Sequence, residues 1–255
     1  MYKTKILILC MFMEKTFSQD VQYVYHPSNE RGKADYGWLK TNYSFSFANY
    51  LNPQKMGFGL LKVLNDDYIA PGKGFGTHSH ENMEIVTIPL SGELEHKDSK
   101  GNHGIIKKND IQIMSAGKGI KHSEFNPSKI EITNTLQTWI LPDAINVEPR
   151  YEQLTVNPCE FKNNLRIVVA PNTPEALHIN QKAIYAIGDV DSNLIFEYKI
   201  NFEGNGVYVF LIEGELEILN KVLNKRDAIG IWNTDKIILK PKVNSKVLLI
   251  EVPMK

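Results

Sequence analysis

Two pairs of side chains between residues 74 and 126 have the types and the spacing of a metal site. His78 and His80 stand two residues apart, and His122 and Glu124 repeat that spacing further along the chain. Alternate side chains of a β-strand point to the same face, so each pair would offer two ligands in one direction. Three imidazoles and one carboxylate suit Fe(II), Mn, Co, Ni, Cu or Zn better than Mg or Ca.

A lone His-x-His pair would be weak evidence, because seven histidines in 255 residues make some close pairs unsurprising. The second pair strengthens the prediction, since it follows at a distance that suits neighbouring strands of a barrel. A zinc-protease helix is excluded, because the segment HENME has no second histidine four residues after His80. A closed four-coordinate zinc ion, purely structural, stays an alternative.

Short apolar runs separated by turn residues fill most of the chain. Between residues 60 and 141 the patterns predict strands at 60–64, 84–90, 93–97, 104–106, 111–114, 120–124 and 135–141. Many short strands at regular spacing are typical of a sandwich or a barrel. Helix is expected only in small pieces, one of them around residues 149–154.

Three segments of the first half recur in the second. LSGELEH (90–96) returns as IEGELEI (212–218), KKNDIQIM (107–114) as NKRDAIGIW (224–232), and LQTWILP (136–142) as LLIEVP (248–253). The repeat predicts two barrels, at residues 21–150 and 151–255. No histidine lies between Gly188 and Lys255, so we expect the second barrel to be metal-free. Its Tyr208 and Trp232 are interpreted as packing residues.

Composition argues against a nucleic-acid or membrane-surface partner, because 29 basic residues balance 29 acidic ones and the pI is about 7.1. Cys10 and Cys159 lie too far apart in the chain to indicate a disulfide framework, which is compatible with a reducing compartment, so we expect a cytoplasmic protein. We also expect a monomer. Residues 1–20 are interpreted as an extension, whose apolar run 6–13 is too short to span a bilayer. Export by a short signal and a true start at Met13 stay alternatives.

The residues around both pairs resemble the cupin superfamily and, within it, the pirin-like proteins. The spacing from Gly72 through the two histidines to Gly92 fits the first cupin motif, although Glu84 sits one place before the usual glutamate ligand. In pirins the carboxylate ligand comes from a second motif, which SAGKGIKHSE (115–124) matches. By this resemblance Glu124 is the ligand and Glu84 is not.

The resemblance to bacterial pirin-like quercetin dioxygenases covers nearly the whole chain after about Val21. It includes NERGKADYGWLKTNYSFSFANY (29–50), MGFGLLKVLNDD (56–67), LQTWILP (136–142) and PRYEQ (149–153). One departure is Tyr43, where many relatives have histidine, so no role in lining the site is expected for this side chain.

The resemblance implies an all-β bicupin with one divalent transition metal, first of all Fe(II), held by His78, His80, His122 and Glu124. It also implies oxidative opening of a flavonol such as quercetin with O2. Glu124 would then both bind the metal and accept the proton of a substrate hydroxyl. An apolar mouth for the flat substrate is expected from Phe75, Met83 and Ile120.

A second hypothesis comes from another class of protein. Animal pirins are described as iron-binding transcriptional coregulators, so the resemblance is also compatible with a metal-binding regulatory or protein-interaction protein without turnover. The balanced charge and the lack of a nucleic-acid motif argue against direct DNA contact. Turnover of quercetin separates the two hypotheses.

Overall fold

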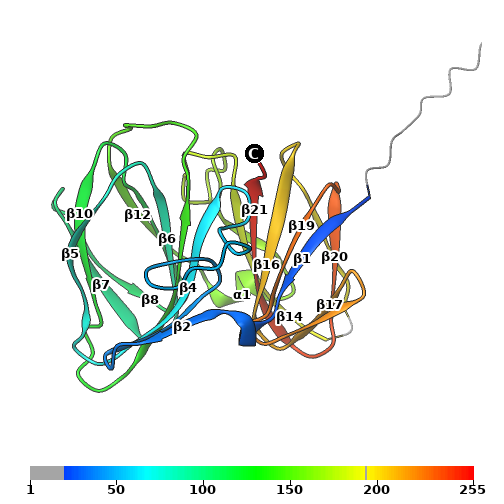
Figure 1. The fold of residues 1–255 in the computed structure, drawn as a ribbon, viewed down its shortest axis with the longest axis horizontal. Coiled ribbons are helices and arrows are strands. Elements are labelled where there is room, and N and C mark those ends of the chain that lie inside the picture. Colours follow the sequence, from blue (N-terminus) through cyan, green and yellow to red (C-terminus); the bar gives the residue numbers. More distant parts are fainter. Residues whose placement is uncertain (1–19, 193) are drawn as a thin grey trace, which may run out of the picture.

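The computed structural model describes residues 20–192 and 194–255, which form an almost entirely β protein. Two large sheets, of seven and six strands, each face a four-stranded sheet. Figure 1 shows the two resulting barrels side by side. The predicted all-β, two-barrel cupin fold is confirmed. Residues 1–19 of the expected extension lie outside the described part of the chain.

The first barrel combines the sheets β12-β9-β6-β11-β4-β3-β2 and β5-β10-β7-β8. Its strands are β2 (Gly32–Asp35), β3 (Leu39–Tyr43), β4 (Leu61–Ile69), β5 (Gly74–His80), β6 (Glu84–Ser91), β7 (Glu93–Asp98), β8 (His103–Lys107), β9 (Asp110–Ser115), β10 (Ile120–Phe125), β11 (Thr133–Ile140) and β12 (Arg150–Thr155). The strands predicted between residues 60 and 141 are all present, most of them longer by one to several residues.

The second barrel combines the sheets β1-β19-β16-β21-β14-β13 and β15-β20-β17-β18. Its strands are β1 (Gln22–His26), β13 (Arg166–Val169), β14 (Ile184–Val190), β15 (Phe196–Lys199), β16 (Asn205–Glu213), β17 (Glu215–Ile218), β18 (Lys221–Asn224), β19 (Ala228–Trp232), β20 (Lys236–Pro241) and β21 (Ser245–Pro253). The described helices are η1 (Ser28–Glu30) and α1 (Pro158–Phe161). Among the described residues, no helix is long and apolar enough to cross a membrane.

Two strands lie in a different barrel from the one that the expected division at residue 150 gives them. β1 pairs with β19 of the second barrel, and β12 pairs with β9 of the first. The helix expected around residues 149–154 is therefore wrong, because this segment is strand β12. The two strands lie at corresponding edges of the two large sheets. Each pairs with backbone groups of its neighbouring strand that would otherwise be unpaired.

The internal repeat corresponds to the same tight turn in both barrels. Gly92, between β6 and β7, has φ +72°, and Gly214, between β16 and β17, has φ +101°. A Cβ on Gly92 would lie 2.9 Å from the Cα of Thr133, and one on Gly214 would lie 2.7 Å from the Cα of Ser245. Both turns require glycine because of this positive φ and this close backbone approach.

The two large sheets pack against each other and form the central core. Leu64, Leu136 and Val86 of the first barrel share this core with Tyr208 and Phe210 of the second. Tyr208 is completely buried, which agrees with its interpretation as a packing residue. Because side chains alternate along a strand, the neighbours of these leucines face the interior of the first barrel.

Candidate metal centre

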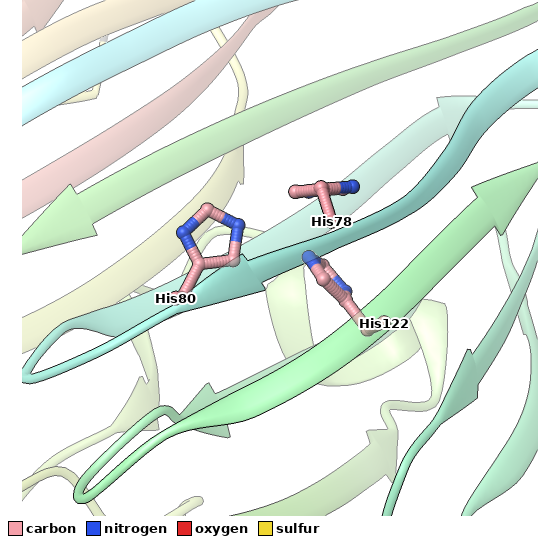
Figure 2. A group of neighbouring side chains, drawn as sticks. All are labelled: His78, His80 and His122. Carbon is pink, nitrogen blue, oxygen red and sulfur yellow. The ribbon is translucent and has the colours of Figure 1, made fainter.

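Strands β5 and β10 bring three histidines together on the interior face of the four-stranded sheet. The strands are antiparallel, and His122 lies directly opposite His78. The ring centroids of His78 lie 4.9 Å from His80 and 4.4 Å from His122. Figure 2 shows the three rings facing one another from the two strands. One ring nitrogen from each lies within 4.8 Å of the others.

A β-bulge decides which further side chain of β5 faces this interior. Beyond the pair of His122 with His78, the register shifts, so that Glu124 pairs with Phe75. An unbroken ladder would instead place Gly76 opposite Glu124. The bulge therefore turns an aromatic ring toward the carboxylate, a placement that the strict period of two in the sequence does not predict.

A fourth histidine joins the centre from strand β7. His96 is fully buried and lies opposite Glu124 in the pairing of β7 with β10. Together with His122 and Glu124 it forms a second group whose possible ligand atoms lie within 4.8 Å of one another. His96 was not predicted as a site residue, although it lies near the end of the predicted strand 93–97 and two residues before Asp98.

The hydrogen bonds of His96 assign the proton positions on His122. The Nε2 atom of His96 lies 3.4 Å from a carboxylate oxygen of Asp98, which can only accept, so Nε2 is the donor. Burial lowers the pKa of His96, which keeps the ring neutral and leaves its Nδ1 as an acceptor. The Nδ1 atom of His122, at 3.4 Å, then donates to it. This leaves the lone pair of His122 on Nε2.

Two buried atoms of the centre have no hydrogen-bond partner anywhere in the described protein, Nε2 of His122 and Oε1 of Glu124. Leaving such a group unpaired costs roughly 1–3 kcal/mol. Burial, and then the neighbouring His78, His80 and His96, lower the pKa of His122 to about 2, so its ring is neutral. A metal ion would pair both atoms, and the donor set fits a transition metal.

The other two histidines can also present a ring nitrogen as a ligand. Nδ1 of His78 lies 2.8 Å from the carbonyl oxygen of Gly76, which accepts its proton, so Nε2 carries the free lone pair. Burial, followed by the charge of His78, lowers the pKa of His80 to about 4. The His80 ring also packs edge to face on Trp139, at 4.8 Å between centroids.

Two residues of strand β11 hold the carboxylate of Glu124 in place. Nε2 of Gln137 donates to Oε2 of Glu124 at 2.8 Å, while Nε1 of Trp139 donates to Oε1 of Gln137 at 3.1 Å. Because an indole nitrogen can only donate, Trp139 fixes the orientation of the Gln137 amide. Burial raises the pKa of Glu124 and outweighs the hydrogen bond from Gln137, which lowers it.

Gln137 belongs to a row of polar side chains that crosses the seven-stranded sheet. The strand registers place these residues opposite one another in the order Tyr43, Asn65, Gln137, Thr87, Gln112 and Gln153. The wall of the first barrel that faces the histidines is therefore polar.

The second barrel has apolar residues in place of this chemistry. The repeat relates β7 to β17, which pair with β10 and β20 respectively. Aligning the two strand pairs puts Ile237 and Leu239 at the positions of His122 and Glu124. Both are buried in an apolar cluster that fills the second barrel. Within residues 20–192 and 194–255, both groups of possible metal ligands lie in the first barrel.

Other residues that the sequence singled out lie outside the centre. Glu84 belongs to neither ligand group, and its carboxylate accepts hydrogen bonds from Oγ of Ser115 at 2.9 Å and Nδ2 of Asn180 at 3.1 Å. Met83 and Ile120, expected to form an apolar mouth, belong to a small apolar cluster that also includes Trp139. Of that expected mouth, Phe75 lines a cavity beside the centre.

Two barrels of this topology, with a histidine and carboxylate cluster inside the first, define a bicupin with one candidate metal centre. Residues 24–140 match the family Pirin, and residues 167–252 match the family Quercetinase C-terminal cupin domain. The chain belongs to the pirin family of cupin proteins.

Relatives from several bacteria are similar over nearly their full length. A quercetin 2,3-dioxygenase of Escherichia coli K12 is 38% identical over 227 residues, which are 89% of this chain and 96% of the relative. A pirin-like protein of Caulobacter vibrioides is 33% identical, over 88% of this chain and 97% of its own. The structure of the bacterial pirin YhhW from E. coli in complex with nickel(II) is 36% identical, with a TM-score of 0.86, and covers 91% of this chain and 99% of YhhW.

Proposed function

We propose that this protein is a metal-dependent dioxygenase that opens flavonols such as quercetin with O2 at His78, His80, His122 and Glu124. The observation that carries the proposal is the pair of unpaired buried atoms, Nε2 of His122 and Oε1 of Glu124, inside a cluster of histidines. The name of the E. coli relative, a quercetin 2,3-dioxygenase, supports the reaction class.

Four protein ligands leave one or two coordination positions open on a five- or six-coordinate ion. When bound, such a metal supplies a Lewis acid that can take a substrate oxygen or dioxygen. The protein supplies the proton acceptor. The carboxylate of Glu124 belongs to a group of possible ligands and would lie beside the bound substrate, where it can take the proton of a flavonol hydroxyl.

The structure of YhhW shows nickel(II) bound in a related pirin. For this chain we propose one divalent transition metal, with Fe(II) first and Mn, Co, Ni, Cu or Zn as the other candidates that the donor set accepts. We further propose that the protein acts as a cytoplasmic monomer whose partners are a flavonol-like aromatic compound and O2.

Purified protein of known metal content, incubated with quercetin in air, tests this function. We expect quercetin to disappear together with an equal amount of O2, in proportion to the bound metal. Stoichiometric metal without any consumption of quercetin or O2 would instead support the hypothesis of a metal-binding protein without turnover.

The hydrogen-bonded chain behind His122 leads to a separate prediction. Replacing His96 with alanine removes the acceptor that orients the His122 ring, and such changes typically weaken metal binding about 10- to 100-fold. Competition with a chelator measures the affinity. His103→Ala, an exposed histidine on the neighbouring strand β8, is the control and should bind metal as the unmodified protein does. Equal affinity in both variants would contradict a positioning role of His96.

A further inference from the structure

A cavity of about 240 Å³ lies beside the candidate metal centre, between β3 and β4 on one side and β5 on the other. Five aromatic side chains line it: Tyr36, Trp38, Tyr43, Phe47 and Phe75. The rings of Trp38 and Phe75 meet edge to face at 5.3 Å, at the β5 side of the cavity. Tyr43, for which the sequence indicated no such role, is part of this wall. The walls suit a flat aromatic ring.

Two polar side chains of β4 interrupt this aromatic lining. Asn65 is 5% exposed, and its Oδ1 has no hydrogen-bond partner in the described chain. Asp67 is 4% exposed, and burial raises its pKa to about 7, with further contributions from the charges of Asp66 and Glu124. The amide oxygen and the carboxylate both accept hydrogen bonds, so an occupant that donates them would satisfy this pair.

The cavity adjoins the metal centre through two contacts. Phe75 pairs directly across from Glu124 in the pairing of β5 with β10, and Asn65 pairs across from Gln137, which holds the Glu124 carboxylate. At the other side, Phe47 packs on Trp139 at 5.3 Å, and Trp139 packs on His80. A ring in the cavity would therefore lie next to the carboxylate side of the centre.

We propose that this cavity binds a hydroxylated aryl ring of the substrate, with Asp67 and Asn65 accepting hydrogen bonds from its hydroxyl groups. The inference rests on the proposed function, because it takes the substrate to be a flavonol whose reacting hydroxyl meets Glu124. It adds a specificity site, which selects flavonols that carry hydroxyl groups on an outer ring.

Two flavonols separate this site from the metal centre. Quercetin carries hydroxyl groups on its outer rings, whereas 3-hydroxyflavone has only the hydroxyl expected to meet Glu124. Binding of each to metal-loaded protein without O2 is measured by quenching of tryptophan fluorescence. At about pH 8, above the raised pKa of Asp67, we expect the unmodified protein to prefer quercetin, and Asp67→Asn to weaken quercetin binding about tenfold or more, as for loss of a hydrogen bond to a charged group. Binding of 3-hydroxyflavone should stay the same, which also shows that the variant is folded.

The outcomes distinguish the inference from the proposed function. An unmodified protein that prefers quercetin through Asp67 but does not consume it in air leaves the inference standing and overturns the function. Turnover of quercetin without any effect of Asp67→Asn on its affinity does the reverse. Should Asp67→Asn not fold, Asn65→Ser replaces it, with the same loss of preference expected. Aromatic walls and a carboxylate also suit a cation such as choline. If choline displaced quercetin, the cavity would be a cation site, and the inference would be overturned.

Discussion

Replacing Glu124 with glutamine is expected to lower quercetin turnover about a hundredfold or more while most of the metal stays bound. An amide keeps an oxygen for the metal but is not basic near neutral pH, so proton acceptance is lost. The structure adds a smaller effect. With its oxygen toward the metal, the new amide nitrogen faces Nε2 of Gln137, so one hydrogen bond of about 1 kcal/mol is lost. Turnover is therefore measured per bound metal, at saturating metal.

Glu84→Gln is the matched control for this experiment. Glu84 is also buried and its pKa is also raised by burial, but its carboxylate accepts from Ser115 and Asn180, away from both ligand groups. The control should bind metal and turn over quercetin nearly as the unmodified protein does. Loss of metal in Glu84→Gln together with full activity in Glu124→Gln would mean that Glu84 is the carboxylate ligand.

Replacing His122 with alanine is expected to remove most of the metal, from close to one equivalent per chain to less than about a tenth. His122 belongs to both groups of possible ligands, and its buried Nε2 has no hydrogen-bond partner in the described protein. A missing ligand leaves the remaining donors too few for tight binding. Elemental analysis of the purified variant measures the content directly.

His178→Ala controls for the loss of a histidine as such, because His178 is exposed and lies in the segment between β13 and β14. Its metal content should equal that of the unmodified protein. Full occupancy in His122→Ala would contradict the proposed ligand set, and would show that the nearby His96 or another donor holds the ion.

Local pattern was enough to predict most of the strands and the two pairs of site residues. A strand needs only its own alternation to put His78 and His80, or His122 and Glu124, on one face. The tight turns at Gly92 and Gly214 recur with their flanking residues, so the repeat revealed two barrels. From the lack of histidine between Gly188 and Lys255 we predicted a metal-free second barrel, and the structure adds that an apolar cluster fills its interior.

Features that depend on which strands become neighbours could not be predicted in this way. The pairing of β1 with β19 in the second barrel joins segments about 200 residues apart. The segment expected to be helical at 149–154 forms strand β12 because it pairs with the edge of β9. Local propensity carries no information on such pairings.

The same limit separates what the sequence determined about the site from what only the tertiary structure decided. The sequence determined the types and the facing of the four proposed ligands. The folded chain decided that His96 stands behind His122, that Trp139 orients Gln137 toward Glu124, and that a bulge turns Phe75 into a cavity with Asp67. These contacts arise where separate strands meet, because sheet register, rather than spacing along one strand, sets which side chains touch across a barrel.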